Sequence, residues 1–217
     1  ERMKMLKQAQ YDMLQAQINP HFLYNTLETI NWMAYDIAGG ENDVSEALVN
    51  LAGFFRNTLS FSGYLITVDE EIQYTKDYIK ILHLRYADLF TVRWDIDEAM
   101  LPCKVIKTCL QPIIENAVYH GFKPKGGNGL LEITGRLDGN NIVFRLSDDG
   151  VGMSEDDVLK LNEGLNTNVF SNTTSHIGLA NVNKRIKILF GEKYGLTVKS
   201  QPGKGTEVCI VIPSSRQ

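Results

Sequence analysis

The first third of the chain carries apolar residues at helical spacing. They recur between residues 3 and 37 at intervals of three, four or multiples of these: Leu6, Met13, Leu23, Leu27, Ile30, Ala34 and Ile37. Gly39-Gly40 is expected to end this helix. A second helix is predicted from a cap at Asp43 or Ser45 to about Leu59. Because two helices alone cannot bury apolar residues on two sides, the hairpin predicts a dimer that completes a four-helix bundle.

Beyond residue 63, shorter and alternating segments replace the long helical pattern. The predicted elements are a helix from Thr67 or Asp69 to about Tyr86, a strand from Phe90 to Ile96, a helix from Val105 to His120 closed by Gly121, hairpins over 130–146 and 196–212, and a helix over 178–190. The polar stretch 162–175 is expected to form a mobile loop. This alternation predicts an α+β domain in which helices cover one face of a mixed sheet.

Composition and charge exclude several classes of protein. Of the 217 residues 43% are hydrophobic, which is enough for a core of ordinary size. The net charge of -4 argues against a broad nucleic-acid-binding surface, and the three cysteines have no disulfide or zinc spacing. No apolar run is long enough to span a membrane. Because the sequence opens at Glu1 within a helical pattern, we expect it to be the C-terminal piece of a longer protein.

The first candidate for chemistry is Asn19-Pro20-His21, inside the first predicted helix. Pro20 has no N–H and is expected to kink the helix, at a cost of about 3 kcal/mol. His21 then lies at the kink, where a neutral imidazole is a nucleophile that Asn25, one turn away, can orient. The alternative is a bent helix on which His21 is an ordinary surface residue.

A second candidate is the segment 111–121, QPIIENAVYHG. Glu115, Asn116 and His120 are polar groups on an otherwise apolar helix. The amide oxygen of Asn116 is a ligand type that suits Mg²⁺, which usually arrives with nucleotide phosphates. The alternative is a helix whose polar face meets water.

The third candidate comprises three turns in the last third of the chain. Asp148 follows a predicted strand and can accept a hydrogen bond from an exocyclic amine, while Gly150 and Gly152 let a flat ring approach the backbone. The helix that opens near Gly178 offers free N–H groups to a phosphate, and Lys184 and Arg185 on it are either added charge or ordinary solvated residues. The turn GKGT at 203–206 belongs to the same site or is only a hairpin turn.

Together these segments resemble the LytS/YesM-type sensor histidine kinases. The resemblance rests on residues 14–35 (LQAQINPHFLYNTLETINWMAY), 111–122 (QPIIENAVYHGF), 148–153 (DDGVGM), 177–189 (IGLANVNKRIKIL) and 203–206 (GKGT). It implies an α+β chain with two domains. A dimerisation and phosphoacceptor hairpin over 1–63 forms a dimeric four-helix bundle, and a GHKL-type ATPase domain with a Bergerat fold, an α/β sandwich, covers 64–217.

The resemblance also implies roles for single residues. His21 is the expected phosphoacceptor, with Asn25 beside it and Glu115 as a candidate proton acceptor. Asn116 is the expected Mg²⁺ ligand and Asp148 the expected adenine-binding aspartate. The other expected contacts to ATP are His120, Gly150, Gly152, Met153, Gly178, Leu179, Asn181, Gly205 and Thr206.

Two positions depart from the family pattern. Phe22 stands where the larger histidine-kinase family has an acidic residue after the phosphoacceptor, so Glu115 and His21 unaided are both candidates for handling the proton. Ser175-His176 stands where related ATPases carry another glycine. His176 therefore lies near the phosphates or has no chemical role.

The resemblance predicts ATP- and Mg²⁺-dependent autophosphorylation of His21, then transfer to an aspartate in the receiver domain of a response regulator. The segment 61–67, with Gly63, is the expected hinge between the two domains. The alternatives are an ATPase of this class that does not phosphorylate itself and a degenerate kinase that serves as a dimeric scaffold. We expect a homodimer on the cytoplasmic side of a bacterial inner or plasma membrane, attached only through segments upstream of this chain.

Overall fold

The structure is a computed structural model that describes residues 20–59, 64–167 and 177–215. It divides into two compact units, residues 1–61 and 62–217, and each unit is described by itself. Within the described ranges no helix combines the length and the apolar character needed to cross a membrane.

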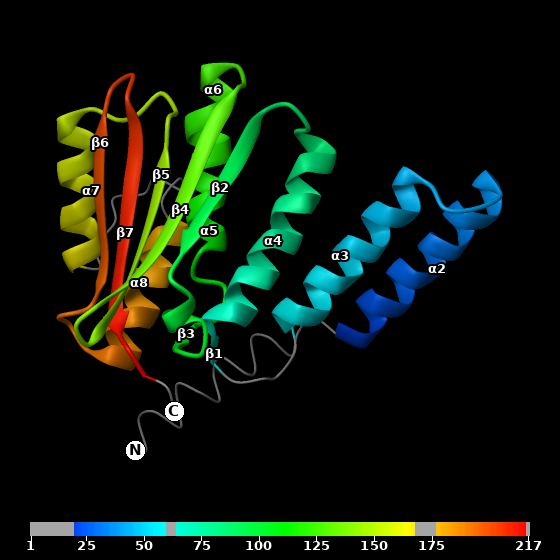
Figure 1. Ribbon diagram of the computed structural model, residues 1–217. Coiled ribbons are helices and arrows are strands. Elements are labelled where there is room, and N and C mark those ends of the chain that lie inside the picture. The colour runs from blue at the N-terminus through cyan, green and yellow to red at the C-terminus, as the bar shows by residue number, and fades with distance from the viewer. Residues whose placement is uncertain (1–19, 60–63, 168–176, 216–217) are drawn as a thin grey trace. The chain divides into compact units, whose positions relative to one another are not determined.

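The first unit is a hairpin of two helices, α2 (Pro20–Ala38) and α3 (Asp43–Leu59) (Figure 1). The second helix has the predicted bounds, but its cap is Asn42 and not Asp43 or Ser45. The side-chain oxygen of Asn42 accepts the N–H of Ser45 at 3.0 Å, because it stands just before the first free N–H groups of the helix. The predicted helix before residue 20, and with it the kink, lies outside the described residues.

The second unit is built on a five-stranded sheet in the order β2-β4-β5-β7-β6. Its strands are β2 (Phe90–Ile96), β4 (Gly129–Asp138), β5 (Asn141–Asp148), β6 (Gly195–Gln201) and β7 (Gly205–Pro213). Because β2 runs parallel to β4 and the other neighbours are antiparallel, the sheet is mixed. The strand at 90–96 and both predicted hairpins are confirmed.

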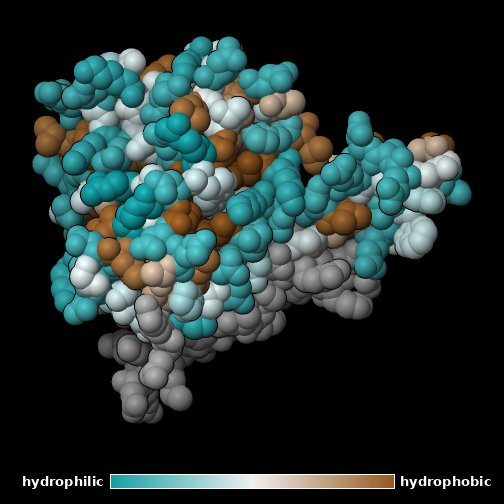
Figure 2. Space-filling view, viewed as in Figure 1, coloured by the Kyte–Doolittle hydropathy of each residue, from teal (hydrophilic) through white to brown (hydrophobic). Residues whose placement is uncertain are grey.

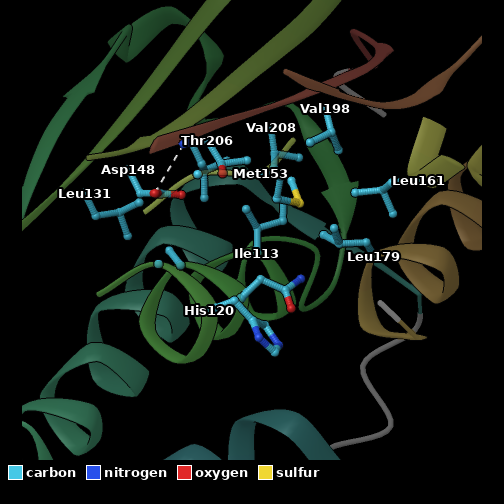
Figure 3. A pocket seen from close by; sticks show the side chains of 15 residues that line it. Ile113, His120, Leu131, Asp148, Met153, Leu161, Leu179, Val198, Thr206 and Val208 are labelled. Atoms are coloured by element: carbon cyan, nitrogen blue, oxygen red, sulfur yellow. Dashed lines mark hydrogen bonds between the residues drawn. The ribbon is translucent and has the colours of Figure 1, made fainter. Parts of the chain in front are cut away.

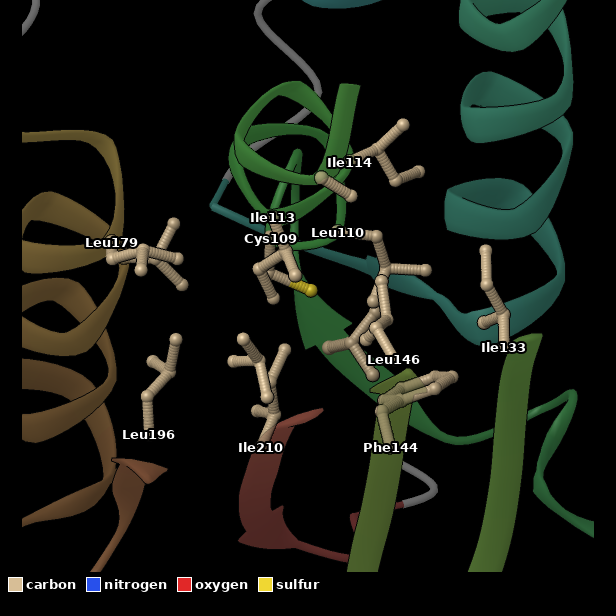
Figure 4. Packing of buried hydrophobic residues seen from close by; sticks show 14 of the residues in the cluster. Cys109, Leu110, Ile113, Ile114, Ile133, Phe144, Leu146, Leu179, Leu196 and Ile210 are labelled. Carbon is tan, nitrogen blue, oxygen red and sulfur yellow. The ribbon is translucent and has the colours of Figure 1, made fainter. Parts of the chain in front are cut away.

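The register of the strands places the core on one face of this sheet. Leu146 of β5 lies between Ile133 of β4 and Val208 of β7, and all three are buried. The row beside it contains Phe144 and Ile210, which are also buried. Because side chains alternate along a strand, these rows share the face toward the helices. Figure 4 shows Ile133, Leu146, Phe144 and Ile210 beneath α5, with α8 at one side. Figure 2 shows mainly hydrophilic residues on the visible surface, with hydrophobic ones in small groups.

Helices cover that face of the sheet, which confirms the α+β prediction. They are α4 (Val68–Arg85), α5 (Gln111–Asn116), the π-helical segment η2 (Ala117–Phe122), α6 (Lys123–Lys125), α7 (Glu155–Thr167) and α8 (Ile177–Phe190); a short 3-10 turn, η1 (Glu98–Met100), follows β2. Helix α4 is capped by Thr67, which is one of the two residues predicted to begin it. Its side chain accepts the N–H of Glu70 at 3.1 Å, and the Glu70 carboxylate accepts the N–H of Thr67 at 2.7 Å.

The predicted single helix from Val105 to His120 is wrong at both ends. Its first residues belong to strand β3 (Lys104–Ile106), which pairs antiparallel with β1 (Leu65–Thr67). A three-residue strand is too short to show a period, so its apolar residues Val105 and Ile106 were merged with the pattern of the following helix. At the other end Gly121 does not stop the helix, which continues through η2 and α6 to a left-handed Gly126.

Two further predictions about connecting segments are corrected. Residues 162–167 are not loop but the end of α7, which Ser154 precedes as a cap that accepts the N–H of Asp157 at 3.2 Å. Only Leu161, Gly164 and Leu165 of this helix are buried, and so small an apolar stripe gives a weak signal. Residues 65–67 of the expected hinge form β1 and belong to the second unit. Residues 60–63 and 168–176 are outside the described part.

Candidate functional site

The alternation along β5 turns its last residue, Asp148, toward the helices. Asp148 continues the buried series at every second position of the strand, and its register partners are Leu131 on β4 and Thr206 on β7. One carboxylate oxygen, Oδ1, accepts the N–H of Gly150 at 2.9 Å. It also accepts the N–H of Thr206 at 3.3 Å (Figure 3). A carboxylate is thereby fixed at the end of an otherwise apolar row.

Burial raises the pKa of Asp148 to about 6, and the hydrogen bonds from Gly150 and Thr206 oppose the rise. At pH 7 the group is therefore mostly ionised, yet it lies in a setting that disfavours its charge. A donor from a bound ring amine would relieve this cost.

The opposite wall is formed by one face of α5 and η2. Ile113, Asn116, Ala117 and His120 are spaced by three and four residues, so they share one helix face and line the cavity under the sheet, with the side chain of His120 exposed. The Nδ2 atom of Asn116 is buried and has no hydrogen-bond partner among the described residues. A buried amide without a partner in a cavity is the kind of group that a polar ligand satisfies.

The cavity between these walls is small in this structure, with a volume of about 50 Å³. Ligand pockets usually have roughly 300–1,000 Å³. A purine therefore requires side chains to move outward, and the unbranched Met153 is the most adaptable of them. The lining residues are Ile113, Asn116, Ala117, His120, Gly121, Leu131, Leu146, Asp148, Gly152, Met153, Leu161, Leu179, Val198, Thr206 and Val208.

Two glycines of the turn after β5 bring segments of backbone together beside this cavity. A Cβ on Gly150 would lie 2.5 Å from the Cα of Gly121 in η2. Gly152 has φ of +69°, and a Cβ there would lie 1.9 Å from the carbonyl oxygen of Gln201. These glycines therefore let the turn approach other backbone segments of the protein itself. This packing of the turn holds Asp148 against η2.

The structure brings seven of the predicted site residues into this cavity: Asn116, His120, Asp148, Gly152, Met153, Leu179 and Thr206. Three others support its walls. Gly150 packs on η2, Gly178 approaches Pro112 of α5, and Gly205 lies against the carbonyl of Asp148. Asn181 is exposed on α8 and is not among the lining residues.

Glu115 and the two predicted residues of the first unit lie elsewhere. The Oε1 atom of Glu115 accepts the hydroxyl of Tyr78 on α4 at 2.8 Å and the amide of Gln111 at 3.0 Å, and Glu115 does not line the cavity. His21 and Asn25 belong to α2 by backbone, while their side chains are outside the described part.

Sequence reasoning missed Ser200 and the apolar walls. The hydroxyl of Ser200 accepts the N–H of Met153 at 2.9 Å and donates to the carbonyl of Gly205 at 2.7 Å, so it ties the turn after β5 to the β6–β7 turn. A serine in a predicted hairpin gives no signal of this. Leu131, Leu146, Val198 and Val208 were predictable from strand alternation, and Ile113, Ala117 and Leu179 from helical spacing. Leu161 was not, because it comes from the missed helix α7.

Comparison with known proteins agrees with this geometry. Residues 9–90 match the family model "Histidine kinase", and residues 104–216 match "Histidine kinase-, DNA gyrase B-, and HSP90-like ATPase". The histidine kinase domain of a blue-light-activated kinase from Erythrobacter litoralis aligns over 96% of this chain and 93% of its own, with a TM-score of 0.52 at 15% identity. The catalytic domain of the histidine kinase ThkA aligns over 69% of this chain and 96% of its own, with a TM-score of 0.52 at 17% identity. These likenesses support the fold.

Three curated sensor kinases are similar over 98% of the chain. They are YesM of Bacillus subtilis (33% identity), YpdA of Escherichia coli (33%) and HptS of Staphylococcus aureus (29%). The aligned part is 35%, 36% and 40% of these proteins, respectively, so the chain spans little more than a third of the length of its relatives.

Proposed function

Because the chain belongs to the histidine kinase family, we propose that it binds ATP with Mg²⁺ in the cavity at Asp148 and phosphorylates itself on His21. The observation that carries this proposal is the pairing of a partly buried carboxylate with a buried amide nitrogen that has no partner among the described residues, across one apolar cavity. Asp148 lies at one end as the acceptor, and the Nδ2 atom of Asn116 lies on the opposite wall.

Each end of the cavity suits a different part of the nucleotide. Asp148 is a hydrogen-bond acceptor for the exocyclic amine of adenine, and the apolar walls at Leu131, Leu146 and Val208 suit a flat ring. Leu179 in the first turn of α8 places the start of that helix beside the cavity, where N–H groups favour phosphate. The carbonyl end of the Asn116 amide is a ligand type for Mg²⁺. When bound, Mg²⁺ neutralises charge that develops on the phosphates.

The transfer step uses the imidazole of His21 as the nucleophile. The lone pair of a neutral ring nitrogen forms a bond to the γ-phosphorus, the bond from that phosphorus to the β–γ bridging oxygen breaks, and ADP leaves. The proton on the other ring nitrogen is then released. A neutral imidazole carries its own nucleophilic lone pair, so His21 can attack without a separate base removing a proton first. Glu115 remains the other candidate acceptor, although Tyr78 and Gln111 already engage its carboxylate.

We place the phosphoacceptor hairpin at residues 1–63 and the ATP-binding domain at 64–217. The hairpin exposes large apolar side chains, among them Trp32 at 70%, Met33 at 59% and Ile37 at 87%. Surfaces of this kind are covered in stable proteins, and a second hairpin would complete a four-helix bundle. We therefore propose a homodimer. The receiver domain of a response regulator is the proposed recipient of the phosphoryl group, and the longer protein is proposed to lie in a bacterial membrane.

Labelling with γ-labelled ATP and Mg²⁺ tests the assignment of His21. We expect a label on the chain that is lost in acid and stable in base, as a phosphoramidate requires, and that is absent from His21→Gln. ADP binding is expected to be unchanged in this variant. Label that persists in His21→Gln would exclude His21, and release of phosphate without any labelled chain would indicate an ATPase that does not phosphorylate itself.

A further inference from the structure

Helix α4 contributes a carboxylate that is buried outside the cavity. Glu71 is 0% exposed. Its Oε2 accepts the N–H of Thr108 at 2.7 Å, and its Oε1 accepts the N–H of Leu110 at 3.0 Å. Both N–H groups belong to the loop between β3 and α5, so one side chain binds the two ends of this short connection.

The loop has no cap of its own. Leu110 stands at the cap position of α5 and has no side-chain acceptor, and Thr108 adopts a left-handed φ of +56°. Both features cost free energy, because free N–H groups at a buried helix start need an acceptor and a threonine rarely takes positive φ. Glu71 supplies the missing acceptor from another helix.

The same loop is also held from α8. The Nη2 atom of Arg185 donates to the carbonyl of Lys107 at 2.6 Å, and Lys107 is buried at 6% exposure. The start of α5 is thus bound by α4 on one side and by α8 on the other. Helix α5 then runs directly to Asn116 and, through η2, to His120, which both line the cavity.

We propose that Glu71 is a positioning residue for nucleotide binding, whose carboxylate fixes the start of α5 so that Asn116 and His120 face the cavity. The inference rests on the proposed function of that cavity. Five residues separate the bound loop from Asn116, and a tilt at the start of a short helix displaces everything that follows. Displacements of about 1 Å at a site have large effects on function.

Titration of Glu71 gives this role a distinctive signature. Burial raises its pKa to about 7, and the hydrogen bonds from Leu110 and Thr108 oppose the rise. The titratable groups that interact with it are Cys109 and Lys107 from the loop and Tyr74 of its own helix. Arg185 of α8 and Glu70 of α4 act in turn on Lys107. Below pH 7 the carboxylate gains a proton and loses acceptor capacity toward the loop. Nucleotide binding should therefore weaken between pH 8 and pH 6.

The test is calorimetric binding of ADP with Mg²⁺ to the wild-type chain, to Glu71→Gln and to the control Glu70→Gln. Glu70→Gln makes the same change of charge one residue away, at an exposed position where the carboxylate is hydrogen-bonded to Thr67 and interacts more weakly with the charges of Lys104 and Lys107. At pH 8 we expect the Kd of Glu71→Gln to exceed that of wild type by about fivefold or more, a usual size for coupling between sites, and the control to match wild type. At pH 6 the ratio should fall toward one, and this ratio cancels the titration of ADP itself.

A ratio that does not change with pH, or an equal effect of Glu70→Gln, would overturn the inference and leave the proposed function standing. Failure of the wild-type chain to bind ADP would overturn both. If Glu71→Gln does not fold, carbon-13 NMR of the Glu71 carboxyl in the wild-type chain replaces it. By reciprocal linkage ADP should lower the pKa of this carboxyl, and an unchanged pKa contradicts the role.

Discussion

Replacing Asp148 with asparagine should stabilise the chain while it weakens nucleotide binding. The pKa of Asp148 is raised from the ordinary 3.8 to about 6, so the ionised group costs the folded state at most about 3 kcal/mol. The neutral amide avoids this cost, and the hydrogen bonds from Gly150 and Thr206 need no separate term because the raised pKa already includes them. The amide NH₂ that replaces an acceptor oxygen needs a partner of its own, at a cost of about 1 kcal/mol. The expected net gain at pH 8 is about 1–2 kcal/mol.

The difference in stability between Asp148→Asn and the wild-type chain depends on pH. A carboxyl with a raised pKa adds stability that is present below its unfolded pKa near 4 and is lost as the pH rises through about 6. Asp148→Asn should therefore exceed wild type in stability above pH 6, and the difference should shrink toward pH 4.5. Nucleotide affinity should fall in the variant, because it loses a charged acceptor for the adenine amine. Losing a hydrogen bond to a charged group costs about 1.5–3 kcal/mol of binding free energy, which corresponds to a Kd for ADP roughly 10- to 150-fold higher.

Urea unfolding at pH 8 and pH 5, with calorimetric titration of ADP at pH 8, measures both effects. The matched control is Asp149→Asn. Asp149 is the exposed neighbour, paired with Lys125 at 2.8 Å, and its pKa is lowered, so its replacement should not stabilise the chain at pH 8. Wild-type affinity in Asp148→Asn, or a stability difference that stays constant from pH 5 to pH 8, would refute this view of the cavity.

Three further substitutions separate binding from folding. Asn116→Ala should remove the increase in ADP affinity that Mg²⁺ gives, measured as the ratio of Kd without and with the ion; a wild-type ratio would exclude Asn116 as the ligand. Gly150→Ala places a Cβ 2.5 Å from the Cα of Gly121 and should cost about 1–3 kcal/mol in urea unfolding, so an unchanged midpoint contradicts the packing. Thr67→Ala removes the capping box of α4 and should cost about 1 kcal/mol while ADP affinity stays at the wild-type value; a change in affinity would mean that this cap also supports the site.

Local patterns predicted most of the elements of this chain. The strand over 90–96 and the hairpins around β4–β5 and β6–β7 were predictable because alternation along the strands and Gly-containing turns agree. The helix over 43–59 was equally clear in its apolar spacing. The two hairpins and the helix are formed by residues near one another in sequence, and the strand over 90–96, which pairs with the distant β4, was predictable because its seven residues are enough to show the alternation.

The errors fall where tertiary contacts decide the structure. Strand β3 exists because β1, about 40 residues earlier, pairs with it, and no local signal in three residues records this. Helix α7 buries only a small stripe against β6 and α8, although Ser154 followed by Asp157 was a readable start signal. Gly121 was expected to end a helix, but it is retained in the π-helical segment because the turn at Gly150 packs directly on it.

The site residues also divide into those with a local sequence motif and those set by contacts between distant segments. Asp148, Asn116 and the glycine turns could be proposed from the sequence because each has its own local motif. Glu71 and Ser200 could not, since each connects segments that are distant in the chain. Nothing in the sequence around Glu71, one of three consecutive acidic residues 69–71, distinguishes the buried carboxylate from the exposed ones.

The most direct test of the central claim is to locate the phosphoryl group itself. The wild-type chain and Asp148→Asn are incubated with ATP and Mg²⁺, and the site is mapped by electron-transfer mass spectrometry at alkaline pH, where phosphohistidine survives. We predict phosphate on His21 of the wild-type chain and a large loss of it in Asp148→Asn. Phosphate on another residue, or equal phosphorylation of His21 in both proteins, would contradict the account.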